Sequence, residues 1–152
     1  MFAILGLLLF TGGVKSQCID SAAIVYGGYC DPRIEPVCGC DGYTYQNDCF
    51  ARNAGLRWWN SNAICDPVDF YFNPNPPDNG IINVDAWLKY PGVMYVELVD
   101  RFGNIYYQTG FQGQDHYLFQ INLSGFPVGI YLLRCYTEEG SRTKKVAKIY
   151  ED

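Results

Sequence analysis

Beyond residue 80, apolar and polar side chains alternate along the chain in short stretches. These stretches cover residues 81–87, 93–100, 104–109, 116–123, 129–137 and 144–150. Alternation with a period of two places the apolar side chains on one face of a β-strand. Residues that favour turns, chiefly Gly, Pro, Asn and Asp, separate the stretches, and no helical periodicity lies between them. The pattern predicts an all-β domain, an antiparallel sandwich of the immunoglobulin-like kind.

The N-terminal residues carry a different pattern, an uninterrupted apolar run over residues 2–10. This run is too short to span a bilayer but suits the hydrophobic part of a signal peptide. Val14 and Ser16 supply the small residues that a signal peptidase requires, so we expect residues 1–16 to be a signal peptide cut after Ser16. The alternative is a buried N-terminal helix or strand. A signal peptide predicts that the mature protein is exported.

Cysteine usage fits an exported protein. Of seven cysteines, six lie between Cys18 and Cys65, and Cys135 stands alone downstream. An even number of cysteines clustered in a short exported segment predicts disulfides, which stabilise a domain too small for a large core. Cys38 and Cys40 are poorly placed to pair with each other, because so small a ring strains the disulfide. Zinc is the competing use of such a pair, but export favours disulfides, and we expect no metal.

The charge distribution and the motifs that the sequence lacks exclude several classes of function. The formal charge of −5 is spread without an acidic or basic block, so we expect no nucleic-acid partner. His116 is the only histidine, and no nucleophilic-serine elbow, phosphate-binding Gly loop or metal-binding His pair occurs. We therefore expect neither an enzyme nor a cofactor. We expect Cys135 to be a small buried hydrophobe, with a reactive or intermolecular thiol as the alternative.

Composition divides the chain into three parts after the signal peptide. Residues 17–66 hold the clustered cysteines, residues 67–80 hold four prolines and form a linker or the entry to the next domain, and residues 81–152 hold the alternating strands. In the first part, Asn47 or Asp48 can cap a short helix. The chain is therefore expected to contain a small α+β domain followed by an all-β domain.

The stretch PVCGCDGYTYQNDC, residues 36–49, resembles the Kazal family of serine-protease inhibitors, and the likeness extends over residues 18–65. The matching residues are Pro36, Val37, Cys38, Gly39, Asp41, Gly42, Thr44, Tyr45, Asn47 and Cys49, with Cys65 at the end. The family's usual cysteine three residues after Cys49 is replaced here by Arg52, and Cys40 is additional. The resemblance implies a disulfide-rich α+β fold. The bridges it implies join Cys18 to Cys40, Cys30 to Cys49 and Cys38 to Cys65.

Kazal inhibitors present the loop between their second and third cysteines as a rigid, extended strand that fills a protease cleft. In this chain the resemblance implies a protease-binding loop over residues 31–37. Its contact residues would be Asp31, Pro32, Arg33, Ile34 and Glu35. Pro32 takes the primary specificity position, and Asn47, Pro36 and Tyr45 would support the loop. We therefore expect a secreted inhibitor of a serine-type endopeptidase.

Pro32 sets a difficulty for that expectation. Proline has no backbone N–H to donate to the protease, and its ring offers little to a deep pocket. An acceptor left unmet in a buried interface costs up to about 3 kcal/mol, so trypsin-like and chymotrypsin-like proteases should bind weakly. The alternative is a non-inhibitory cell-surface module with a protein-binding or structural role.

The C-terminal region, residues 70–152, resembles a sorting domain of the bacterial type IX secretion system. Pro74, Asn75 and Pro76 match the opening motif of that family. The later matches are Pro127, Gly129, Ile130 and Tyr131, followed by Lys144, Lys145 and Lys148 in the last strand. The alternative is an ordinary β-sandwich for binding or adhesion.

The sorting-domain resemblance implies both partners and a location. The partners are the type IX translocon and the sortase that removes the domain, after which the cargo is released or attached to lipopolysaccharide. The protein would then be secreted or on the cell surface, at the exterior of the outer membrane, in a bacterium of the Bacteroidota.

Overall fold

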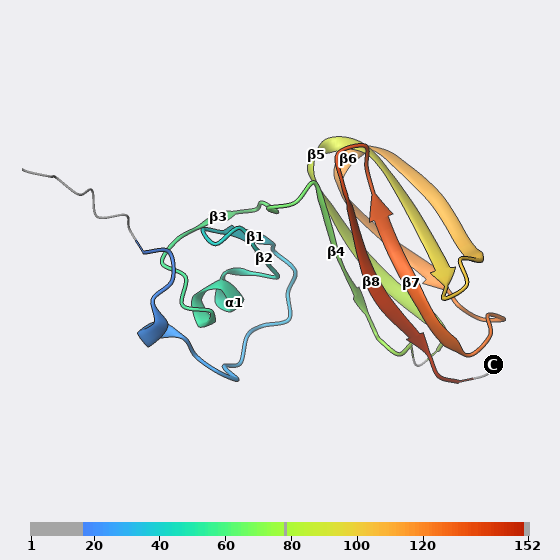
Figure 1. Ribbon diagram of the computed structural model, residues 1–152, viewed down its shortest axis with the longest axis horizontal. Helices are drawn as coiled ribbons and strands as arrows, with labels where there is room; N and C mark the ends of the chain where they lie inside the picture. Colours follow the sequence, from blue (N-terminus) through green and yellow to red (C-terminus); the bar gives the residue numbers. More distant parts are fainter. Residues whose placement is uncertain (1–16, 78, 151–152) are drawn as a thin grey trace, which may run out of the picture.

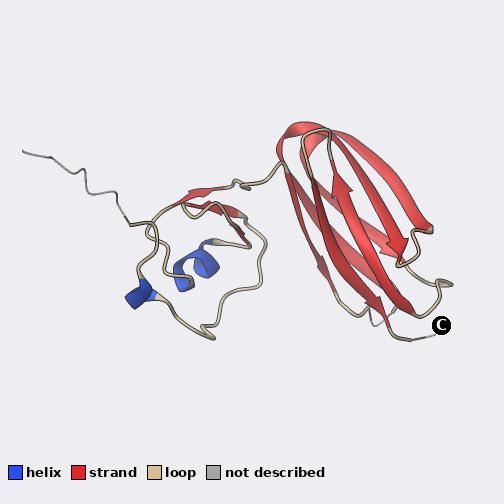
Figure 2. Cartoon of the chain, in the orientation of Figure 1, coloured by secondary structure: helices blue, strands red, loops and turns tan. Residues whose placement is uncertain are grey.

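The computed structural model describes residues 17–77 and 79–150. The expected signal peptide over residues 1–16 lies outside the described residues. Figure 1 and Figure 2 show a small first domain with little regular structure and an all-strand second domain, joined by one chain segment. None of the described helices is long and apolar enough to cross a membrane.

The first domain is a three-stranded antiparallel sheet beside one short α-helix. Its elements are η1 (Ser21–Ala23), β1 (Val37–Gly39), β2 (Thr44–Tyr45), α1 (Asp48–Asn53) and β3 (Trp59–Ser61), and the sheet order is β2-β1-β3. Asn47 is the N-cap of α1. Gly55 follows the helix with a positive φ, and a Cβ there would lie 2.5 Å from the Asp20 carbonyl oxygen.

The core of this domain is small, and disulfides supplement it. Val37, Ala51 and Leu56 form its buried apolar cluster, with Tyr45 and Trp59 packed against them. The disulfides are Cys18–Cys40, Cys30–Cys49 and Cys38–Cys65, with Cα separations of 5.7, 5.8 and 4.9 Å. This is the pairing that the Kazal resemblance implied. The cross-links stabilise the small domain by constraining its unfolded chain.

The second domain is a β-sandwich made from one folded sheet. Its strands are β4 (Val68–Asn73), β5 (Ile81–Asp100), β6 (Ile105–Asn122), β7 (Gly129–Tyr136) and β8 (Ser141–Lys148). The first half of β5 pairs with β4 and the end of β6, whereas its second half pairs with β7 and the start of β6. The β5–β6 ribbon folds over near residues 88–92, where its register shifts (Figure 1), so that it contributes to both layers.

Alternating side chains fill the space between the two layers. The most deeply buried ones on β5 are at most 1% exposed, and they are Ile82, Val84, Ala86, Met94, Val96 and Leu98. Cys135 of β7 is free and buried among them, and this burial raises the pKa of its thiol to about 12. It therefore packs as a small apolar side chain with little thiolate at neutral pH.

The sheet begins earlier than the sequence predicted. Residues 67–80 were expected to form a linker or the entry to the next domain, and β4 lies within them and pairs with β5 along its whole length. Val68 and Phe70 are fully buried in the sandwich core. The strand pattern is short here and the prolines after it are prominent, which is why the region was predicted as a linker or domain entry.

Strand lengths also differ from the prediction. The expected strands at 81–87 and 93–100 are one continuous strand, β5, and those at 104–109 and 116–123 are one strand, β6. Residues that favour turns, including Gly92, bend the ribbon without ending its ladder, which resumes after the register shift. The turns expected between residues 87 and 93 and between residues 109 and 116 are therefore the bend at which the β5–β6 ribbon passes from one layer of the sandwich to the other.

The Pro74, Asn75 and Pro76 motif ties the start of the second domain to its last strand. The side-chain amide of Asn75 donates to the Lys145 carbonyl at 3.1 Å, and its oxygen accepts the Ala147 N–H at 3.0 Å. One side chain thus satisfies two backbone groups on the outer edge of β8, as a strand residue would.

A buried ion pair connects β4 to β8. Asp69 is 2% exposed, and its Oδ1 lies 3.1 Å from Lys144 Nζ and 3.4 Å from Arg142 Nε. Lys144 Nζ also donates to the Phe70 carbonyl. Arg142 extends the network to Asp66, at 3.3 Å. Because the Asp69 carboxylate is shielded from water, its two cations are needed to stabilise it.

Candidate functional site

The segment between Cys30 and Cys38 is an extended, exposed loop that is held at both ends. Cys30 is bonded to Cys49 on α1, and Cys38 is bonded to Cys65. The loop runs from η1 toward β1 around the outside of the first domain (Figure 1). Most of its residues are exposed, whereas Pro36 and Val37 are buried where the loop enters the sheet. The fold therefore presents residues 31–35 in a short loop that is anchored by a disulfide at each end.

Asn47 holds this loop from beneath. Its side chain is fully buried, and Nδ2 donates to the carbonyl oxygens of Asp31 and Arg33, each at 2.9 Å. Its Oδ1 accepts the N–H groups of Cys49 and Phe50 at 3.1 and 3.4 Å, which caps α1. One amide thus joins the loop to the helix. The two loop carbonyls that it binds lie on either side of Pro32, so Pro32 is the residue that the arrangement presents.

Gln46 makes a second set of contacts that sequence reasoning missed. Its Nε2 donates to the Pro32 carbonyl at 2.6 Å and approaches the Arg33 carbonyl at 3.3 Å. Its backbone carbonyl accepts the Glu35 N–H at 2.9 Å. On the loop itself, Asp31 Oδ1 accepts the Arg33 N–H at 2.9 Å. The only sequence signal for Gln46 was its position next to Asn47.

The charged side chains of the loop pair with each other. Arg33 lies 3.6 Å from Glu35 and 3.7 Å from Asp48. All three side chains are at least 40% exposed, so these pairs contribute little to stability.

The other two expected supporting residues act through the sheet. The Pro36 carbonyl accepts the Ala63 N–H at 3.1 Å, which fixes the exit of the loop. Tyr45 pairs across the strands with Val37 and makes no hydrogen bond to residues 31–35 among those described. Its hydroxyl donates to Asp41 at 2.7 Å. Burial and this hydrogen bond raise the pKa of Tyr45 to about 12.

The residues of the expected sorting motif have separate roles in the second domain. Tyr131 is 2% exposed and its hydroxyl donates to the Pro127 carbonyl at 2.6 Å, whereas Ile130 on the opposite face of β7 is 46% exposed. Gly129 begins β7. On β8, Lys148 is buried and donates to the Leu123 carbonyl at 2.9 Å.

The three lysines are therefore not equivalent. Lys144 belongs to the ion pair with Asp69, Lys148 is buried, and Lys145 is exposed. The motif largely builds and closes the sandwich. Its exposed members, which another protein could contact, are Pro127, Ile130 and Lys145.

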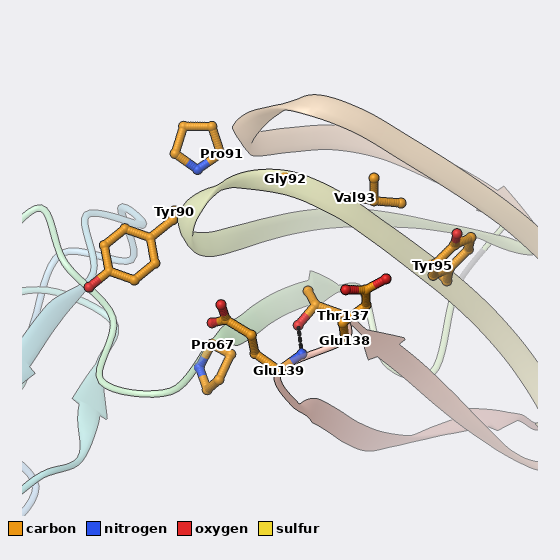
Figure 3. A pocket seen from close by; sticks show the side chains of 9 residues that line it. All are labelled: Pro67, Tyr90, Pro91, Gly92, Val93, Tyr95, Thr137, Glu138 and Glu139. Carbon is orange, nitrogen blue, oxygen red and sulfur yellow. Dashed lines mark hydrogen bonds between the residues drawn. The ribbon is translucent and has the colours of Figure 1, made fainter.

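An open hollow also lies on the second domain. Figure 3 shows it between the bend of β5 at residues 90–93, the turn at residues 137–139 and Pro67. Glu138 and Glu139 are its charged residues, and none of its lining residues is Ser, Cys or His. Within residues 17–77 and 79–150, no group of three His, Cys, Asp or Glu side chains is arranged to hold a metal ion.

Comparison with protein families identifies two regions. A model of the secretion system C-terminal sorting domain matches residues 71–149, which is more than half of the chain. A model of the Kazal-type serine protease inhibitor domain matches residues 16–55. A search of the curated proteins finds no match. The two families are those that the sequence resembled, in the same order.

Proposed function

The chain belongs to the secretion system C-terminal sorting domain family, with a Kazal-type domain ahead of it, and on this premise we propose that the Kazal-type domain inhibits a serine endopeptidase. The sorting domain marks the protein as secreted or attached to the cell surface through type IX secretion. The inhibitor would therefore act outside the cell. We assign the contact with the protease to residues 31–37 and give the protein no enzymatic activity of its own.

The observation that carries this proposal is the pair of hydrogen bonds from Asn47. They hold the carbonyls of Asp31 and Arg33 at 2.9 Å each, so the backbone around Pro32 is already ordered before a partner arrives. Preorganisation raises affinity because less conformational freedom is lost on binding. The disulfides at both ends of the loop would also keep the two chain segments together if the bond after Pro32 were cut.

The test is an inhibition assay with the mature chain against a broad panel of serine endopeptidases. We expect inhibition of a protease that tolerates proline at the primary position, and little effect on trypsin because Pro32 has no N–H. The variant Pro32→Arg should inhibit trypsin, since it restores both the N–H and a side chain that trypsin binds. If neither form inhibits any enzyme of the panel, the inhibitor proposal is wrong.

A second candidate function has a specific observation in its favour. Pro32 lacks a donor, and its carbonyl is already bound by Gln46 at 2.6 Å. A loop arranged in this way also suits a non-inhibitory protein-binding or structural module at the cell surface. Failure of both forms in the inhibition assay is the result that this alternative predicts.

We further propose that residues 17–66 are the cargo and that the sorting domain begins with β4. In this proposal the translocon recognises the C-terminal domain and the sortase removes it, with attachment of the cargo to lipopolysaccharide. Intact-mass analysis of surface material tests the last two steps. A cargo that lacks the second domain and carries added lipopolysaccharide mass supports them, and uncleaved chain as the sole surface product contradicts them.

A further inference from the structure

The peptide bond between Pro32 and Arg33 has both of its polar groups occupied in the free protein. Gln46 Nε2 donates to the Pro32 carbonyl oxygen at 2.6 Å, and the Arg33 N–H donates to Asp31 Oδ1 at 2.9 Å. The backbone bond from the Glu35 N–H to the Gln46 carbonyl keeps Gln46 beside the loop. Under the proposed function, this is the peptide bond that a protease would face.

A serine protease needs the same carbonyl oxygen. Its oxyanion hole places preorganised N–H donors around the oxygen of the bond under attack. A carbonyl oxygen has two lone pairs. Gln46 uses one of them, so an oxyanion hole with two donors cannot be fully satisfied until Gln46 withdraws.

We propose that Gln46 is a latch on the Pro32 carbonyl, which must open before an oxyanion hole can bind that oxygen. The inference rests on the proposed inhibitor function and adds Gln46 to Pro32 as a residue that weakens the binding of the loop to a serine protease. The latch acts on the backbone, so it weakens inhibition whatever side chain stands at position 32. Loss of one net hydrogen bond of this kind corresponds to a change of about fivefold in an inhibition constant.

A purely supportive role for Gln46 predicts the opposite sign. If Gln46 only kept the loop rigid, its removal would increase the ordering cost of binding and weaken inhibition. The latch should dominate because Asn47, which is fully buried, already fixes the carbonyls of Asp31 and Arg33. Gln46 is half-buried, and its bonds to the loop are exposed to water.

The experiment compares two variants of the mature chain as trypsin inhibitors. The first is Pro32→Arg, and the second adds Gln46→Met, which keeps the size of the side chain but removes the donor. We expect the double variant to inhibit about fivefold more tightly, or to inhibit where the single variant does not. Equal or weaker inhibition by the double variant overturns the latch and leaves the inhibitor function standing.

A matched control and an independent readout complete the test. Gln120→Met in the Pro32→Arg background removes a similar exposed glutamine bond, to Asn83 on the second domain, and should leave trypsin inhibition unchanged. If no variant inhibits trypsin, the protease panel decides the inhibitor function, and NMR of the native sequence decides the latch. A scalar coupling across the hydrogen bond from Gln46 Nε2 to the Pro32 carbonyl carbon is expected, and its absence overturns the latch.

Discussion

Asn47 joins the presented loop to the helix, so its replacement should damage both. Asn47→Ala removes four hydrogen bonds, two to loop carbonyls and two to the first N–H groups of α1. The lost helix cap costs about 1 kcal/mol. The two loop bonds cost about 1 kcal/mol each, because their exposed carbonyls can turn to water. The structure therefore predicts a destabilisation of the first domain by about 3 kcal/mol.

Asn47→Ser separates the two roles. Serine is a good N-cap but is too short to reach the loop, so this variant should lose only about 2 kcal/mol. Hydrogen–deuterium exchange read by mass spectrometry assigns the effect to the first domain, because peptides from the two domains are separate. Exchange in β1 and β2 should rise roughly 150-fold in Asn47→Ala and roughly 30-fold in Asn47→Ser.

Two results would refute this reasoning. Exchange within about twofold of the native sequence in Asn47→Ala would mean that its hydrogen bonds contribute almost nothing net. Equal exchange in the alanine and serine variants would mean that the cap is not part of the stabilisation. In either case exchange of the β5–β8 peptides should not change, since Asn47 makes no contact with the second domain among the hydrogen bonds of the described residues.

Three further predictions concern the rest of the molecule. Replacing Cys18 and Cys40 together by serine should lower the stability of the first domain by about 3 kcal/mol in denaturant, and peptide mapping without reduction should show the other two disulfides intact. Asp69→Ala should destabilise the second domain by about 2 kcal/mol, because it removes the charged hydrogen-bond partner of Lys144 and Arg142. Asp66→Ala removes the exposed partner of the same network and should cost less than about 1 kcal/mol, and thermal unfolding distinguishes the two variants. Because the pKa of Tyr45 is raised from 10.0 to about 12, the folded state holds this proton more tightly than the unfolded state. The stability that it contributes to the first domain is complete below pH 10 and is lost between pH 10 and 12. Denaturation of the first domain at each pH should show this loss, and Tyr45→Phe should abolish it.

Most of the features that the sequence predicted correctly depend on interactions between residues close together in the chain. Alternating side chains marked the strands of the sandwich, because a strand must place its apolar residues on one face. The cysteine cluster predicted a disulfide-linked domain, because the small apolar core of so short a segment does not stabilise the fold sufficiently without disulfides. A cap at Asn47 or Asp48 was predicted from these side chains and their place before a short helix, and the structure selects Asn47.

Other features depended on contacts between residues far apart in the chain. The strand β4 was hidden because its pairing with β5 and its ion pair to β8 decide its structure, not its own pattern. The long strands β5 and β6 were predicted as four short ones because the bend of the ribbon contains turn-favouring residues, although the β5–β6 pairing continues beyond it.

By itself, the sequence determined that this chain has a cross-linked domain presenting Pro32 and a secretion sorting domain behind it. Only the tertiary structure decided what surrounds Pro32. Gln46 and Pro32 are fourteen residues apart, and their hydrogen bond exists because the sheet and the Cys30–Cys49 bridge bring the two segments together. Residue types and spacing do not show which side chain donates a hydrogen bond to a backbone carbonyl far away in the sequence, because tertiary packing determines which groups lie close together.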